Sequence, residues 1–158
     1  MLKMIRPFQD GDLQSLASIY RDAIQRIGHE RYTAEQVAAW SSHADDPGFA
    51  EWIATATTFV AVSEDGACMG FGGLQSHGRI ASLFVAPQCM RTGVGSRLLE
   101  RLLQEFGNLQ VSQVTTEASE FSKPLFEKYG FSVSEVEHTT YRGVAFTRYA
   151  MRRELARP

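Results

Sequence analysis

Two closely spaced glycines, Gly93 and Gly95, lie between an apolar run and a helical pattern. The run at 80–85 is followed closely by a proline, and apolar residues at helical spacing begin at Leu98. This order predicts a strand, a glycine-containing turn and a helix. The positive end of a helix has unpaired backbone N–H groups that bind anions, and glycine lets a pyrophosphate approach the main chain closely. The residue types and their spacing therefore predict a phosphate-binding turn.

Other nucleotide-binding patterns fit this turn less well. A Walker A loop requires a lysine directly after its last glycine, but Gly95 is followed by Ser96, so that pattern is excluded. The dinucleotide fingerprint Gly-x-Gly-x-x-Gly matches at Gly93 and Gly95 only, because its third glycine position holds Leu98. Glu117 follows the glycines at a distance that suits the acidic residue of this fingerprint, which contacts the nucleotide ribose. A dinucleotide-binding enzyme therefore stays open as a weaker alternative.

The segment Met90–Gly95 resembles motif A of the GCN5-related N-acetyltransferases, Arg/Gln-x-x-Gly-x-Gly/Ala after a strand that ends in Val-x-Pro. Met90 stands where that family usually has Arg or Gln. The family uses mainly the backbone at this position for the pyrophosphate, so the resemblance implies that Met90 weakens this binding rather than abolishing it. A second family motif, Ala-x-x-Leu-Tyr-Glu-Lys-x-Gly-Phe, is similar to Ser122–Phe131, with Phe126 in place of its tyrosine. Two motifs in the family's order are more specific than either one.

The resemblance implies an α+β fold over nearly the whole chain. Its central twisted sheet has six or seven mostly antiparallel strands, is flanked by helices, and is splayed between the fourth and fifth strands. We expect one acetyltransferase domain at 1–158. Periodicity and turn residues predict strands at 4–8, 58–62, 68–74, 79–85, 109–116, 131–141 and 144–152, and helices at 13–27, 33–40, 49–53, 98–106 and 120–129.

Two helix starts have recognisable capping residues. Asp10 and Asp12 offer a cap for the first helix, which Gly28 ends. Thr33 begins the second helix and has Gln36 three residues on, which is the pattern of a capping box.

Composition and charge narrow the functional class. The chain has 158 residues, 44% of them hydrophobic and 22% charged, which is typical of a globular domain. A net charge of −2 indicates neither nucleic acid nor an anionic membrane as a partner. Cys68 and Cys89 fit no metal or redox spacing, and no apolar run suggests a signal peptide or membrane span. We expect a cytoplasmic enzyme without a metal, as a monomer or homodimer.

The resemblance implies that acetyl-CoA is the cosubstrate and that it lies where the strand at 80–85 splays from the strand at 109–116. The pantetheine arm is expected to pair with the main chain as an added strand, and backbone N–H groups are expected to hold the pyrophosphate. The implied cofactor-binding residues are Leu83, Phe84, Val85, Met90, Arg91, Thr92, Gly93, Val94, Gly95, Ser96, Ser119, Ser122 and Phe126.

Three residues are candidates for proton transfer. Glu117 is the first choice as general base, because a partly buried carboxylate at a strand end often has a raised pKa; a solvated glutamate is an equal alternative. His77 titrates in the useful range, although its Ser-His-Gly turn favours a surface position. Tyr129 is a further candidate, although packing beneath the Gly130 helix end is the favoured explanation for it. Phe126 cannot supply the proton that the family's tyrosine gives to the departing thiolate.

The acceptor is expected to be an amine of a small molecule or peptide. Tyr32, Trp40 and Tyr141 are the candidate substrate-binding residues, with core packing as the alternative for the aromatic residues of the first half. His43 is expected to be an ordinary helix-end residue. The functional alternative is a catalytically silent acyl-CoA-binding sensor, which Met90 and Phe126 favour.

Overall fold

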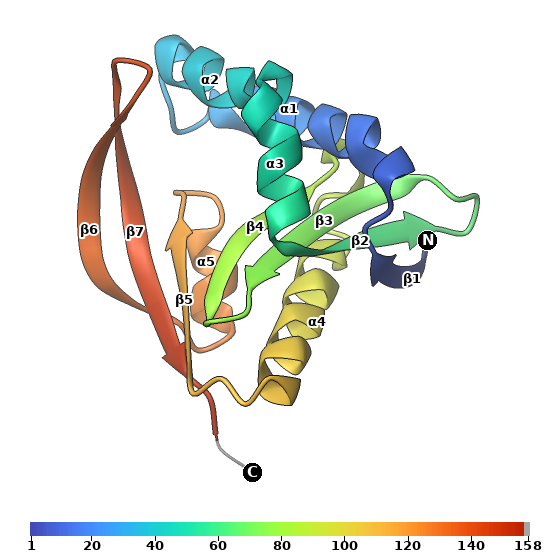
Figure 1. Ribbon diagram of the computed structural model, residues 1–158. Helices are drawn as coiled ribbons and strands as arrows, with labels where there is room; N and C mark the ends of the chain where they lie inside the picture. The colour runs from blue at the N-terminus through green and yellow to red at the C-terminus, as the bar shows by residue number, and fades with distance from the viewer. Residues whose placement is uncertain (157–158) are drawn as a thin grey trace.

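Seven strands form one mixed sheet in the computed structural model, which describes residues 1–156 (Figure 1). Their order across the sheet is β1-β2-β3-β4-β5-β7-β6. The strands are β1 (Leu2–Pro7), β2 (Thr57–Ser63), β3 (Cys68–Gln75), β4 (Arg79–Val85), β5 (Gln113–Ala118), β6 (Ser132–Tyr141) and β7 (Val144–Glu154). The helices are α1 (Leu13–Gly28), α2 (Ala34–Ser41), α3 (Pro47–Thr55), α4 (Val94–Asn108) and α5 (Lys123–Lys128), with short 3-10 turns η1 (Asp10–Asp12), η2 (Ser42–Asp45) and η3 (Pro87–Cys89). The expected domain includes residues 157 and 158, which lie outside the described part.

Strands β4 and β5 separate along their length. They run parallel and are paired at Arg79 and Thr115, whereas the other neighbouring strands are antiparallel over several residues. Figure 1 shows the two strands diverging toward helices α1 to α3. The α+β fold with a splayed sheet is thus confirmed.

The expected strand at 109–116 begins too early. Helix α4 continues to Asn108, and Gln110 has a left-handed φ of 59°, which is incompatible with a strand. The backbone N–H of Val111 donates to the carbonyl of Phe106 and closes the helix end. Strand β5 therefore starts only at Gln113.

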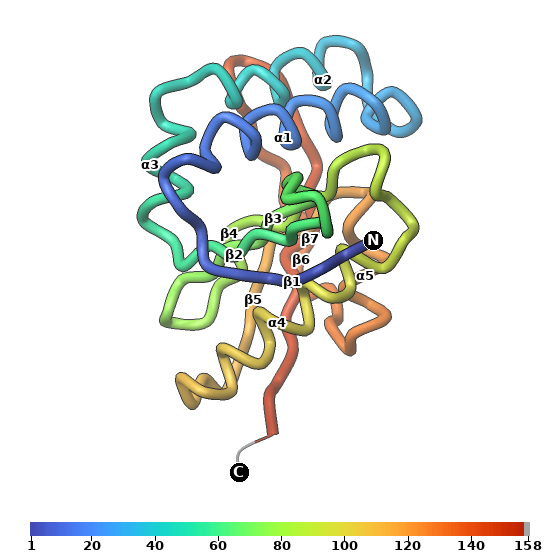
Figure 2. Tube along the Cα trace, turned by 90° about the vertical axis from the view of Figure 1, so that its right-hand side faces the viewer, coloured from blue at the N-terminus to red at the C-terminus, as the bar shows by residue number. Residues whose placement is uncertain are grey.

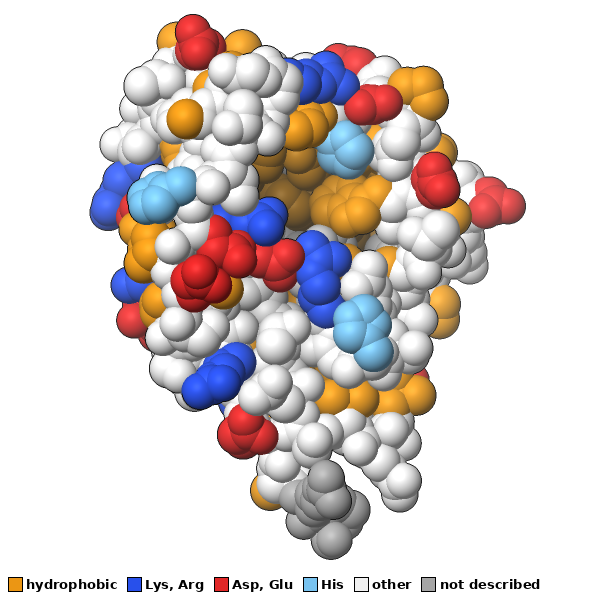
Figure 3. Space-filling model, turned by 60° about the vertical axis from the view of Figure 1, so that its left-hand side comes forward, with side chains coloured by type: hydrophobic (Ala, Val, Ile, Leu, Met, Phe, Trp, Pro, Cys, Tyr) orange, Lys and Arg blue, Asp and Glu red, His pale blue; other side chains and the backbone are white. Residues whose placement is uncertain are grey.

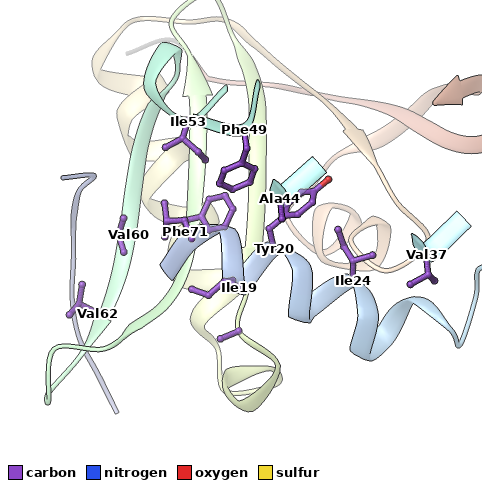
Figure 4. Packing of buried hydrophobic residues seen from close by; sticks show 12 residues of the cluster. Ile19, Tyr20, Ile24, Val37, Ala44, Phe49, Ile53, Val60, Val62 and Phe71 are labelled. Carbon is purple, nitrogen blue, oxygen red and sulfur yellow. The ribbon is translucent and has the colours of Figure 1, made fainter. Parts of the chain in front are cut away.

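Helices α1 to α3 cover one face of the sheet. Ile19 and Tyr20 of α1 are buried near Phe71 of β3 and Phe49 of α3, whereas the buried Ile24 lies toward Val37 of α2 (Figure 4). The predicted capping box of α2 is confirmed by reciprocal hydrogen bonds between Thr33 and Gln36. Asp12 makes no side-chain cap on the first turn of α1, but its carboxylate closes a capping box at the start of η1 by accepting from the backbone N–H of Gln9. The same carboxylate also accepts from the Arg6 guanidinium.

Helix α4 covers the opposite face and approaches β3 closely. A Cβ at Gly70 would lie 2.8 Å from the Phe84 carbonyl oxygen and 3.1 Å from Leu98 Cδ1, so only glycine fits without movement. The buried side of α4, which includes Leu98, Leu99 and Leu102, packs against the sheet and against α5.

The long β6–β7 hairpin reaches from the far edge of the sheet up to α2 (Figures 1 and 2). Arg142 at its tip donates to the Ser42 hydroxyl at 2.9 Å and to the Asp46 carboxylate at 2.7 Å. Gln36 of α2 donates to the backbone carbonyl of Ala145 at 2.9 Å. The hairpin is therefore attached to the helical layer at its tip. In the described part of the chain, the helices are too short or too polar to cross a membrane.

Candidate active site

A cavity of about 620 Å³ lies along the diverging strands β4 and β5. That volume is within the range of small-molecule and cofactor sites, roughly 300–1,000 Å³. Figure 3 shows the hollow, with mainly hydrophobic walls and with acidic and basic side chains grouped at its edge. The lining residues are Tyr20, Ala23, Ile24, Ile27, Trp40, His43, Trp52, Arg79, Ile80, Ala81, Ser82, Leu83, Phe84, Val85, Met90, Arg91, Gly93, Gly95, Ser96, Thr116, Glu117, Ser119, Phe121, Ser122, Leu125 and Phe126.

One end of the cavity is the turn before α4. Gly93 has a left-handed φ of 90° and no side chain caps the first turn of α4 among residues 1–156, so its N–H groups lack such a partner. No atom lies within 4 Å of a Cβ placed on Gly93, and one placed on Gly95 would make only ordinary contacts with Val85 and Leu125, at 3.4 and 3.5 Å. The turn thus combines exposed donors with open space, which fits an anion.

The predicted phosphate-site residues divide into two groups. Met90, Arg91 and Ser96 line the cavity together with the two glycines. Thr92 and Val94 do not line it: the Thr92 hydroxyl donates to a backbone carbonyl of η3, and the Val94 side chain is buried in the core. At Thr92 and Val94, therefore, only the backbone N–H groups can take part in an anion site.

The predicted pantetheine strand also borders the cavity. Leu83, Phe84 and Val85 line it, and β3 pairs with the opposite edge of the same residues. Within residues 1–156, β5 pairs with β4 only between Arg79 and Thr115. The remaining edge of β4 therefore has backbone groups available to an extended ligand.

Glu117 lies in the cavity wall and is paired with Arg79. The Arg79 guanidinium donates to both carboxylate oxygens, at N···O distances of 2.9 and 3.1 Å. Both side chains are partly exposed, at 34% for Arg79 and 22% for Glu117. Glu117 is at the cavity, as predicted. Its carboxylate oxygens accept hydrogen bonds from Arg79, a partner that the sequence did not indicate.

Ser119 and Ser122 form the start of α5. The Ser119 hydroxyl accepts hydrogen bonds from the backbone N–H groups of Phe121 and Ser122, at 3.2 and 3.1 Å. This local network delays the helix, which begins at Lys123 instead of the expected Glu120. Phe126 is only 2% exposed and packs edge-on against the Phe131 ring, so it contributes apolar wall to the cavity.

Two of the candidates for proton transfer lie away from the cavity lining. His77 is exposed in the β3–β4 turn. The Tyr129 hydroxyl donates to the Glu100 carboxylate at 2.8 Å, and that acceptor raises the pKa of the Tyr129 phenol. The structure therefore brings neither side chain together with Glu117.

The predicted substrate-binding residues lie at the helical end of the site. Trp40 lines the cavity, whereas Tyr32 and Tyr141 are not among its lining residues. The Tyr32 hydroxyl accepts from the backbone N–H of Glu120 at 3.0 Å, and its ring packs against Trp40 and Phe121. The Tyr141 hydroxyl is buried without a hydrogen-bond partner in the described part of the chain.

His43 lines this helical end, which the sequence did not predict. It lies on η2 beside Tyr20, Phe49 and Trp52, with ring centroids 5.7, 5.6 and 5.4 Å away. Burial lowers the pKa of the His43 imidazole, and the nearby Asp46 carboxylate opposes that shift. The only signal in the sequence was a histidine within an aromatic stretch, which does not distinguish a core position from a cavity wall.

Comparison with known proteins agrees with this geometry. The model of the acetyltransferase (GNAT) domain family matches residues 29–153. YafP of Escherichia coli K12, an uncharacterized N-acetyltransferase, is 34% identical over 148 residues, covering 94% of this chain and 93% of YafP. A crystal structure of a GCN5-related N-acetyltransferase from Rhodopseudomonas palustris has a TM-score of 0.92 at 26% identity, with 98% of each chain covered.

A further structure supports the fold. The PaiA N-acetyltransferase of Thermoplasma acidophilum, solved in complex with coenzyme A, has a TM-score of 0.78 at 15% identity and covers 98% of this chain and 99% of its own. The match over most of the chain to the family model, together with the relative at 34% identity, decides the family. The chain therefore belongs to the GCN5-related N-acetyltransferase family and is an acetyl-CoA-dependent N-acetyltransferase.

Proposed function

We propose that the protein transfers the acetyl group of acetyl-CoA to a primary amine of a small molecule or peptide, by direct attack while both substrates are bound. The observation that carries the proposal is one continuous cavity that joins the turn at Gly93 and Gly95 to an aromatic end formed by Trp40 and Trp52. A donor that enters from the turn and an acceptor that enters from the helical end meet between β4 and β5. Direct transfer requires this arrangement, because the amine nitrogen must reach the thioester carbon.

The donor half of the cavity offers, in sequence, binding groups for the pyrophosphate, the pantetheine arm and the thioester of acetyl-CoA. The first-turn N–H groups of α4 and the cation of Arg91 would hold the pyrophosphate, and the open edge of β4 would pair with the pantetheine amides. A main-chain N–H near Phe84 or Val85 would polarise the thioester carbonyl, which stabilises the negative charge that develops on its oxygen. The coenzyme A complex of the Thermoplasma structure supports this part of the proposal.

The acceptor half must provide a neutral amine. An alkyl ammonium has a pKa of about 10.4, so most of it is protonated at neutral pH and cannot attack. A positioned base typically contributes about 10²–10⁴-fold to the rate. The departing thiol has a pKa of about 8.5, so its thiolate leaves without an acid at the position of Phe126.

The test is CoA release from acetyl-CoA in the presence of polyamines, amino acids, aminoglycosides and lysine peptides, with calorimetric CoA binding measured alongside. Release that depends on an amine, with a matching acetylated product by mass spectrometry, is the expected result. Tight CoA binding without release on any amine would instead favour the sensor function. Absence of CoA binding would contradict the proposed use of the cavity.

A further inference from the structure

The acceptor end of the cavity contains an imidazole in an aromatic setting. His43 is 23% exposed, lines the cavity, and is held between Tyr20 of α1 and the Phe49 and Trp52 rings of α3. The edge-to-face packing of these rings fixes the imidazole without using its nitrogen atoms. Among residues 1–156, His43 is the histidine in the cavity lining.

The polar surroundings of His43 leave it able to accept a proton. Its Nδ1 lies 3.8 Å from the Asp46 carboxylate, which is beyond a hydrogen bond but close enough to stabilise an imidazolium. Asp46 is itself fixed, since it accepts from the backbone N–H of Gly48 at 3.1 Å and from Arg142 at 2.7 Å. Among the described residues, the nearest carboxylate oxygen to His43 Nδ1 is that of Asp46 at 3.8 Å, and the ring nitrogens have no hydrogen bond within 3.5 Å.

Two charged groups on the surrounding elements, Asp46 and Arg142, act on the pKa of His43. Burial and the Arg142 guanidinium of the β6–β7 hairpin lower the pKa of the imidazole, and Asp46 at the start of α3 opposes them. On α1, burial raises the pKa of Tyr20, whose neutral hydroxyl donates to a backbone carbonyl of α2. The Tyr141 hydroxyl, on the hairpin, is buried and makes no hydrogen bond within residues 1–156. The lowered pKa agrees with an imidazole that can accept a proton near neutral pH.

Glu117 is less suited to the same task. Its carboxylate lies in the same cavity, but Arg79 donates to both of its oxygens. Accepting a proton from an ammonium would require breaking part of this bidentate pair. The cavity therefore contains one carboxylate, Glu117, whose oxygens are hydrogen-bonded to Arg79, and one imidazole, His43, whose nitrogens make no hydrogen bond within residues 1–156 and are free to accept a proton.

We propose that His43 is the general base of the acetyl transfer, a proposal that rests on the proposed function. His43 takes one proton from the bound ammonium, directly or through a water, and later releases it to solvent. The nitrogen lone pair forms the C–N bond, the C–S bond breaks with its electron pair on sulfur, and the second ammonium proton ends on that sulfur. Asp46 stabilises the imidazolium, and the apolar walls also lower the pKa of the ammonium, which makes the first transfer less uphill.

The test is the pH dependence of kcat/KM for the best amine, measured for the wild type, His43→Gln and Glu117→Gln. His29→Gln is the matched control, because His29 is exposed at the end of α1 and does not line the cavity. We expect the wild type to lose activity below an apparent pKa under about 6.5, the ordinary value for histidine. The His43→Gln variant is expected to lose this acidic fall in activity and to have a kcat about 10²-fold lower, with the KM for acetyl-CoA unchanged. The His29→Gln control is expected to keep the wild-type pH profile and kcat.

Other outcomes are equally decisive. A His43→Gln enzyme that keeps the acidic limb, or loss of the limb in Glu117→Gln alone, would overturn the proposal while leaving the proposed function intact. If the variant does not fold, the imidazole of His43 is titrated by NMR in the wild type, and a pKa that differs from the kinetic limb overturns the assignment. A wild type that transfers acetyl to no amine overturns the proposed function itself.

Discussion

The Arg79 guanidinium holds both carboxylate oxygens of Glu117 at the point where strands β4 and β5 separate. The pair thereby links the two strands across the edge of the cavity. A fork-shaped guanidinium matches a carboxylate geometrically, so the interaction is stronger than a single-point ion pair, although solvent weakens it because both side chains are partly exposed.

We expect a double-mutant cycle of Arg79→Gln and Glu117→Gln to give a coupling energy of about 1 kcal/mol in the free energy of unfolding. The value reflects a bidentate pair that remains partly hydrated. Urea denaturation of the wild type, both single variants and the double variant measures it. A coupling energy near zero would show that the pair does not join the strands in solution.

Replacement of Gly93 by alanine should lower the free energy of unfolding by about 1 kcal/mol, because a side chain disfavours its left-handed φ of 90°. No atom lies within 4 Å of the new Cβ, so crowding is not involved. Gly107→Ala is the control: it is helical with equally open surroundings, and should raise stability by about 0.5 kcal/mol. Equal effects of the two substitutions would contradict the left-handed turn.

At Gly70 we expect a larger loss of stability from alanine, about 1–3 kcal/mol, because the Cβ would lie 2.8 Å from the Phe84 carbonyl oxygen. Backbone atoms cannot move aside as a flexible side chain does. Thermal or urea unfolding of Gly70→Ala measures the cost. A substitution without effect would mean that α4 and β4 lie farther from β3 than the structure shows.

Much of this architecture could be predicted from the sequence, because local patterns and the two family motifs specify it. The strand before Gly93, the helix after it and the Thr33 capping box depend on neighbouring residues, and they are observed. The Arg79–Glu117 pair and the position of His43 depend on contacts between elements far apart in the chain, which no local pattern encodes. The Arg6–Asp12 pair likewise joins two elements, β1 and η1, while the same carboxylate closes the capping box of η1.

The Asp12 pair predicts an acid-dependent loss of stability. Hydrogen bonding by Arg6 lowers the pKa of the Asp12 carboxyl, so this group stabilises the fold above its unfolded pKa of about 3.9 and loses that contribution as pH falls through the folded value. At pH 7 we expect the free energy of unfolding of the wild type to be higher than that of Asp12→Asn. Below about pH 4 this difference is expected to shrink. Urea unfolding across pH measures both. A difference independent of pH would contradict the ion pair.

The tip of the β6–β7 hairpin should become more mobile when Arg142 is replaced by alanine, because its bonds to Ser42 and Asp46 attach the tip to the helical layer. Hydrogen exchange at the tip is expected to rise. Arg148→Ala is the control, since Arg148 pairs with Glu137 inside the hairpin and not with α2. Similar exchange in both variants would show that Arg142 does not attach the hairpin.

The proposed function places the acetyl donor in the cavity along β4 and β5. NMR titration of the isotope-labelled protein with CoA tests it most directly, through the backbone amide shifts. We expect the largest shifts at residues 91–96 and 83–85, with smaller ones at Ser119 and Ser122. Saturable shifts centred elsewhere, with these amides unchanged, would contradict it.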